Sequence, residues 1–197
     1  MPGTQTTAIP IRVFRVEGSS DALPQTYRMA QAATQTFNLG TPLSVVAGFL
    51  QATAAIASTA TQIAWISDQF GDNLATAGTA PVGGSGLKYG SVQNQPAAMN
   101  IPIGAPMADG AAGILVANNL TIFQAKTDAA HTLVATDVLS IFGLTKDATT
   151  GNWFVDTTII TAATGACALV TNLIDPIGTV GGKVAFKITQ PYQQINQ

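Results

Sequence analysis

The chain has 197 residues, enough to bury a core without help from disulfides or metals. Only 9% of its residues are Asp, Glu, Lys or Arg, against about 25% in typical soluble domains, and its formal net charge is -2. So weak a charge, with no block of one sign, makes nucleic acid and membrane surfaces poor partners.

The apolar residues and the single cysteine narrow the class of protein further. Mean hydropathy is +0.31, yet no apolar run approaches the roughly 18 residues of a membrane-spanning helix. The N-terminus lacks a basic start followed by an apolar core, so we expect no secretory signal and a chain that folds in a cytoplasm. Cys167 has no second cysteine, which excludes an internal disulfide and a zinc cage of paired thiols. A surface this poor in charge suits an assembly, because a face covered by a neighbour then buries no unpaired charge.

Residues 1–36 are expected to form an N-terminal arm and linker. In IPIRVFRV apolar residues alternate with two arginines, which predicts an exposed β-strand. The linker after it contains serines and a proline, with a short helical turn near residues 27–33. The strand either adds to a neighbour's sheet or forms an edge strand of the chain's own sheet. The candidate partner-interface residues are Ile9, Ile11, Arg12, Val13, Phe14, Arg15 and Val16.

Residues 37–190 have the rhythm of a β domain. The runs TPLSVV and FLQATA flank Ala47-Gly48, a spacing suited to a tight hairpin, and QIAWIS predicts another strand. Residues 75–100 are rich in Gly, Ala and Pro, so we expect a long loop there. GILVANNLTIFQAKT predicts two strands. ATDVLSIFGLT predicts a short helix, capped by Thr136 or Asp137 and ended by Gly143.

The end of the chain continues the strand pattern. NWFVDTTII, ACALVTNLI and GKVAFKITQ predict three more strands, and we expect residues 191–197 to form a polar, flexible tail. In TKDATTGNW, Asp147 offers a carboxylate to local N–H groups and Gly151 accepts a positive φ, which favours a hairpin turn over a Ca²⁺ loop. We therefore predict an all-β fold, a β-barrel or sandwich of short antiparallel strands, with an extended N-terminal arm and one short helix.

Candidates for catalysis depend on His131, the only histidine. Cys167 or a serine would have to act as the nucleophile. The imidazole would be oriented by one of four carboxylates, Asp128, Asp137, Asp156 or Asp175. No G-x-S-x-G nucleophile elbow is present, and an exposed loop histidine is the ordinary outcome. We expect no enzymatic activity, no cofactor and no metal site.

A fixed order of short motifs runs through the second half of the chain. A strand ends in Phe-Gln-Ala at residues 123–125, and a TDV…G step follows at residues 136–143. A Gly-x-Trp-x-Val-Asp strand occupies residues 151–156, and an LIDPIGT turn at residues 173–179 leads into the closing strand. Together with the preceding hairpin, this order resembles small structural proteins of tailed-phage virions, especially the capsid decoration, or cement, proteins.

The resemblance covers residues 37–190, apart from the loop at 75–100. It implies a β-barrel protein on the outer surface of the virion capsid, often a homotrimer, whose partner is the major capsid protein and which stabilises the shell after assembly in the host cytoplasm. Two alternatives stay open. One is another virion component, such as a head fibre base or a tail protein. The other is a carbohydrate-binding β-sandwich, which would need Trp65 or Trp153 exposed rather than packed in the core.

Overall fold

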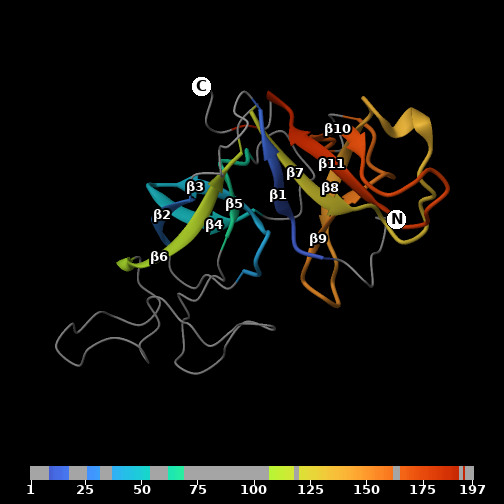
Figure 1. Cartoon of the computed structure of the whole chain (residues 1–197). Coiled ribbons are helices and arrows are strands. Elements are labelled where there is room, and N and C mark those ends of the chain that lie inside the picture. Colours follow the sequence, from blue (N-terminus) through green and yellow to red (C-terminus); the bar gives the residue numbers. More distant parts are fainter. Residues whose placement is uncertain are drawn as a thin grey trace.

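The regular structure of the described part of the chain consists of β-strands and one short 3-10 helix, so the predicted all-β fold is confirmed (Figure 1). The computed structural model describes residues 9–17, 26–31, 37–53, 62–68, 107–117, 120–161, 165–190 and 193. Two groups of strands lie side by side in Figure 1. No helix in these residues is long and apolar enough to cross a membrane.

The larger sheet has six strands. In spatial order they are β1 (Arg12–Val16), β7 (Thr121–Lys126), β11 (Lys183–Ile188), β10 (Ala168–Leu173), β8 (Ile141–Lys146) and β9 (Trp153–Asp156). Every neighbouring pair is antiparallel. Their sequences, such as KVAFKI in β11, are rich in the β-branched and aromatic residues that fit a pleated surface. A parallel bridge between Thr127 and Val155 joins the end of β7 to β9, so the sheet curls back on itself.

The second group has five strands. In spatial order they are β2 (Thr26–Gln31), β4 (Phe49–Ala52), β3 (Pro42–Val46), β5 (Trp65–Ser67) and β6 (Met107–Val116). β6 pairs with β2, and the ring closes through one parallel pair, Gln31 with Leu50. β3 and β4 form the predicted hairpin. Its turn residues, Ala47 and Gly48, have φ angles of 51° and 85°, and two positive values are typical of a two-residue type I′ turn.

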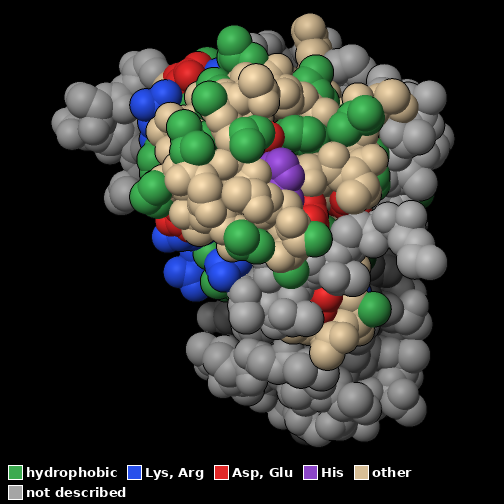
Figure 2. All heavy atoms as spheres, turned by 90° about the vertical axis from the view of Figure 1, so that its right-hand side faces the viewer, with side chains coloured by type: hydrophobic (Ala, Val, Ile, Leu, Met, Phe, Trp, Pro, Cys, Tyr) green, Lys and Arg blue, Asp and Glu red, His purple; other side chains and the backbone are tan. Residues whose placement is uncertain are grey.

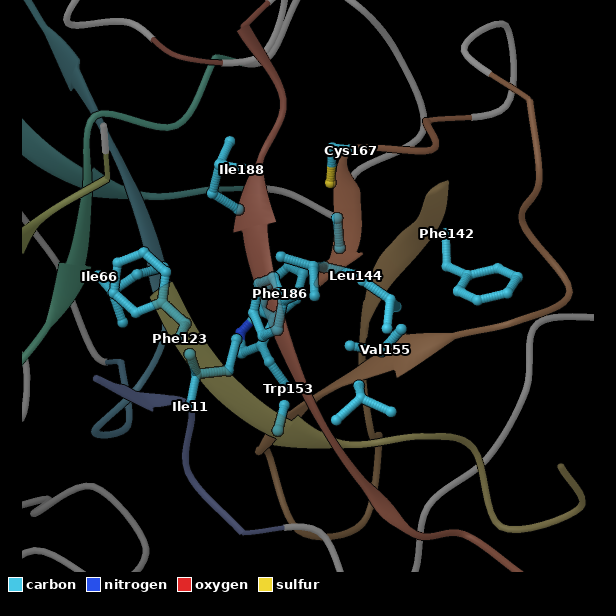
Figure 3. Close-up of a cluster of buried hydrophobic side chains, with 14 of the residues drawn as sticks. Ile11, Ile66, Phe123, Phe142, Leu144, Trp153, Val155, Cys167, Phe186 and Ile188 are labelled. Carbon is cyan, nitrogen blue, oxygen red and sulfur yellow. The ribbon is translucent and has the colours of Figure 1, made fainter. Parts of the chain in front are cut away.

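One hydrophobic core draws on both groups of strands. Its fully buried members include Ile11, Ile63, Ile66, Ala117, Phe123, Trp153 and Phe186. Figure 3 shows Ile66 of β5 beside Phe123 of β7, so the second group packs against the larger sheet. A smaller cluster of Phe37, Leu43 and Leu50 lies within the second group. The shared core makes the arrangement sandwich-like.

The segment expected to be an arm and linker contributes one strand to each group. β1 pairs with β7, and β2 pairs with β6. β1 is therefore an edge strand of the chain's own sheet, the second of the two interpretations. The physical reason is Ile11, which is 1% exposed and belongs to the shared core. The helical turn expected near residues 27–33 is wrong, because residues 26–31 form strand β2.

The short helix predicted from ATDVLSIFGLT is wrong beyond its first turn. Only Ala135–Asp137 is helical, as a 3-10 turn. Val138 already has an extended backbone, with a φ of -65° and a ψ of 129°, which ends the helical path, and β8 begins at Ile141. Gly143, expected to end a helix, lies within β8 and pairs with Asp156 of β9. Pairing with β9 and β10 has overridden the local helical pattern.

Two expectations concern segments outside the described residues. These are the long loop at 75–100 and the tail at 191–197, of which only Gln193 is described. Gln193 makes a parallel bridge with Ile63, and its side-chain amide donates a hydrogen bond to the carbonyl of Ile188 at 2.6 Å. This residue is thus tied to both groups of strands.

Candidate interaction face

Three loops meet at one end of the six-stranded sheet. Because neighbouring strands run in opposite directions, the C-terminal ends of β7, β9 and β10 lie at the same end. The β7–β8 loop covers residues 127–140, and the β10–β11 loop covers residues 174–182. The β9–β10 loop joins two strands that run in the same direction, so it begins at this end with residues 157–161, whereas residues 165–167 directly precede the start of β10.

The β7–β8 loop holds the other two loops in place by hydrogen bonds. On one side, the Thr157 hydroxyl donates to Asp128 Oδ2, and the Thr157 backbone N–H donates to the same oxygen at 3.3 Å. On the other side, the Leu133 N–H donates to the Thr179 carbonyl at 3.0 Å. The Gly178 N–H donates to the Leu133 carbonyl at 2.8 Å. The three loops are therefore preorganised, since polar backbone groups of one are satisfied by another.

The predicted turn between β8 and β9, at the opposite end of the sheet, is built around Asp147. Its Oδ1 atom accepts hydrogen bonds from the N–H groups of Thr149 at 3.1 Å and Thr150 at 2.7 Å. Gly151 has a φ of 71°, a left-handed conformation that glycine adopts without steric cost. The interpretation of TKDATTGNW as a hairpin turn is confirmed.

The same local chemistry fixes the three loops. Carboxylate oxygens accept backbone N–H groups at 2.9–3.2 Å in four places: Asp128 from Ala130, Asp137 from Val134, Asp156 from Thr158 and Asp175 from Lys183. Asp128, Asp137 and Asp156 are each less than 5% exposed. These carboxylates therefore stabilise turns and contribute almost no charge to the surface of the loops.

Exposed apolar side chains gather on these loops. Of the nine large apolar side chains that are exposed in the described residues, six belong to the loops or to the start of β8. We call these six residues the loop face: Val134, Leu139, Ile141, Ile160, Ile177 and Val180. Figure 2 looks onto this side of the molecule and shows hydrophobic side chains around His131. Apolar side chains gathered on one face, rather than scattered singly, are typical of interaction sites.

Exposed charge is sparse on the loop face, although Figure 2 shows acidic side chains next to the histidine. In the described parts of the three loops, the acidic side chains are the buried Asp128 and Asp137 and the partly buried Asp175, which lies 3.5 Å from Lys183 Nζ. The Lys and Arg side chains in Figure 2 lie toward the margin of the view. A partner on this face needs no counter-charge, and docking would desolvate few ions.

Leu139 is the most exposed member of the loop face, at 75%. Its φ of 69° places a bulky residue in the left-handed region, at a cost of about 1–2 kcal/mol. Two hydrogen bonds hold the backbone there: the Leu139 N–H donates to the Val170 carbonyl at 2.8 Å, and the Ser140 hydroxyl donates to the Thr136 carbonyl at 2.7 Å. The strained backbone leaves the Leu139 side chain exposed to solvent, so the strain is not offset by packing of that side chain. Strained backbone conformations of this kind cluster at functional sites.

The residues predicted as a partner interface lie on or beside β1, away from the three loops. Ile11 is buried, whereas Arg12, Phe14 and Arg15 are exposed. The pairing of β1 with β7 shifts register between Val13 and Arg15, which makes a β-bulge. Among the described strands β1 has one neighbour, β7, so it is an edge strand, the kind to which a further strand can add, and its role as a partner interface stays a prediction.

His131 lies at the centre of the loops, and the structure brings one predicted partner to it. The His131 Nε2 atom is 2.9 Å from Asp137 Oδ2, so this carboxylate orients the imidazole. Cys167 is fully buried, and burial raises the pKa of its thiol to about 12, which keeps it protonated at neutral pH. In the parts of the chain that are described, no three His, Cys, Asp or Glu side chains are grouped to hold a metal ion.

The two tryptophans do not form an exposed platform. Trp153 is 1% exposed and belongs to the main core. Trp65 is partly buried and packs against the Phe37 cluster. Neither ring is exposed, so the carbohydrate-binding alternative lacks the exposed tryptophan that it requires.

The loop face was missed by reasoning from the sequence, although one signal was present. In IDPIGTV, Ile177 and Val180 stand among Pro and Gly turn residues, where polar side chains are usual. The pairing that brings these loops together was not visible in any local pattern. Comparison with models of known protein families gives no match for this chain, and comparison with curated protein sequences gives none either.

Proposed function

We propose that this chain is a non-enzymatic structural protein of a phage virion, which binds the outside of the capsid lattice and stabilises it as a decoration protein. The observation that supports this best is the loop face, an apolar and uncharged surface fixed by hydrogen bonds between loops. Such a surface suits a lasting protein neighbour, because the centres of protein interfaces are poor in charge. The resemblance of the motif order at residues 123–179 to capsid decoration proteins points the same way.

The mechanism is stabilisation by mass action. A protein that binds the assembled lattice better than the free subunits shifts the equilibrium toward the assembled shell. The partner is the major capsid protein, and the binding form is a homo-oligomer, with a trimer favoured, because linked copies reach an overall affinity that one contact does not. Neither nucleic acid nor membrane takes part, and the protein joins the virion in the host cytoplasm.

Sedimentation with empty capsids tests this function. Purified chain is mixed with shells that lack it, the shells are pelleted, and the bound amount is measured against the major capsid protein. We expect binding that saturates at a fixed ratio and raises the temperature at which the shells break open. A chain that stays in the supernatant at every concentration contradicts the proposal. Binding to purified tails but not to shells would support the alternative of another virion component.

A further inference from the structure

We propose that the loop face, rather than strand β1, is the surface that docks on the shell, and that it fits an uncharged apolar protein surface presented in repeated copies. This inference rests on the function proposed above and adds to it the docking surface and the chemistry of the partner. It is carried by the distribution of charge, the size of the face and the geometry of Leu139.

The distribution of charge separates the two candidate surfaces. In the described parts of the three loops, the acidic side chains are buried or paired, and apolar side chains project between them. β1 instead exposes Arg12 and Arg15, two of the eight basic residues of the chain. A partner for the loop face must itself be apolar and uncharged, because a charged partner would lose its hydration without gaining a counter-ion.

The size of the face indicates a partner with repeated sites. The loop face has six exposed apolar side chains, whereas a specific, stable interface takes about 20–30 residues of all kinds from each partner. A contact made by these six side chains alone is weak. A lattice that engages several linked copies at once compensates for the weakness, since each further contact is intramolecular.

Leu139 is the best anchor on the face. It is the most exposed of the six residues, and its backbone is fixed by the hydrogen bond to Val170. An anchor on a fixed backbone loses little conformational freedom on binding. Ile177 and Val180 stand on the β10–β11 loop, which hydrogen bonds tie to Leu133 of the β7–β8 loop.

Strand β1 carries features that oppose strand addition. Its register shift makes a bulge, and its exposed arginines place positive charge along the edge. Bulges and charged side chains are the devices by which natural sheets prevent pairing at an edge. Ile11 is held in the core, so its side chain is not available to a partner.

The test measures the binding of variants to empty shells that lack this chain. Leu139→Lys and Ile177→Lys place a charge on the loop face, and we expect each to weaken binding at least about tenfold, because the charge is buried without a partner. Val46→Lys is the matched control, since Val46 is 48% exposed but lies on β3 of the other group of strands. We expect it to bind within about twofold of the wild type. Arg12→Gln together with Arg15→Gln tests β1.

Two further measurements keep the test decisive. Leu139→Gly removes the anchor while favouring the positive φ, so it should keep or raise the thermal midpoint and still weaken binding. Raising NaCl from about 50 to 500 mM should change wild-type affinity by less than about twofold if the contact is uncharged.

Each outcome decides between the two proposals. If the wild type binds shells but Leu139→Lys and Ile177→Lys bind them as tightly as Val46→Lys does, the assignment of the docking surface is wrong and the proposed function stands. Loss of binding in the double arginine variant, together with a strong salt dependence, would transfer the docking role to β1. If the wild type does not bind shells, the proposed function fails, and this inference fails with it.

Discussion

Gly40 offers the sharpest test of how the N-terminal segment is held. It lies just before β3 with a φ of 76°, and a Cβ atom added there would meet the backbone of Ile11, including its carbonyl oxygen at 2.7 Å. Real Cβ atoms essentially never come closer than 3.0 Å to such neighbours. Gly40→Ala must therefore displace either the start of β1 or the Gly40 backbone, whose N–H donates to the Ser67 carbonyl at 2.9 Å.

The size of the effect follows from two separate costs. A positive φ costs alanine about 1–2 kcal/mol, and the smaller entropy of the unfolded chain returns about 0.4–1 kcal/mol. Overlap with Ile11 adds about 1–3 kcal/mol, the usual cost of overpacking. Gly48→Ala is the matched control, because Gly48 has a φ of 85° but no neighbour within 4 Å of the added Cβ. Gly48→Ala should therefore show only the cost of the positive φ and the gain from the smaller entropy of the unfolded chain.

Thermal unfolding followed by circular dichroism measures the difference. For a chain of this size about 1 kcal/mol shifts the midpoint by about 2–4 °C, so Gly40→Ala should melt roughly 2–12 °C below Gly48→Ala, given the overpacking cost. Equal midpoints for the two variants would refute the reasoning. That result would mean that β1 is not packed against Gly40, and the interpretation of residues 9–16 as a free arm would return.

Substitutions at three further positions test other parts of the structure. Trp153→Phe should cost at most about 1.5 kcal/mol, because it removes a buried indole N–H with no hydrogen-bond partner in the described structure, whereas Trp153→Ala should cost about 3–5 kcal/mol in urea unfolding. Asp147→Ala should cost about 1–2 kcal/mol through its lost N–H bonds, and Asp147→Asn less, because it keeps one acceptor oxygen. The Cys167 thiol, whose pKa burial raises to about 12, should react with a thiol reagent at pH 8 only as fast as the protein unfolds. Because the unfolded thiol ionises near its ordinary pKa of 9.0, stability should fall as pH rises from there toward 12, and Cys167→Ala should remove that part of the slope.

Local patterns were sufficient to predict the turns and most of the strands. Ala47-Gly48 between two apolar runs predicted a hairpin, and Asp147 with Gly151 predicted a second. Each of these features depends on residues close together in sequence, so side-chain hydrogen bonds and φ preferences determine them. The helix predicted for residues 135–145 was wrong because strand pairing prevailed over a local helix-capping pattern. The strand partners of β8 lie at residues 153–156 and 168–169, outside that local pattern.

The candidate site could not be predicted because it depends on contacts between distant segments. Leu139, Ile160 and Ile177 are separated by many residues, and only the antiparallel order of β7, β11, β10, β8 and β9 brings their loops to one end of the sheet. The positive φ of Leu139 could not be predicted from the sequence, because a bulky residue such as leucine rarely adopts a left-handed conformation. His131 and Asp137 were named as possible partners, but their distance required the folded loop.

The distribution of charge connects the fold to the proposed function. The chain has ten acidic residues, and five of them, Asp128, Asp137, Asp147, Asp156 and Asp175, accept backbone N–H groups in turns. Four of these five stabilise the three loops and leave the loop face uncharged, so one set of residues both orders the surface and makes it suitable for an apolar neighbour. Exposed lysines or glutamates on the same loops would make the free chain more soluble, but they would have to lose their hydration on docking. We propose that the low charge content suits a surface that a neighbour covers, and the loop-face lysine variants test that proposal separately from the fold, which the Gly40 and Gly48 variants test.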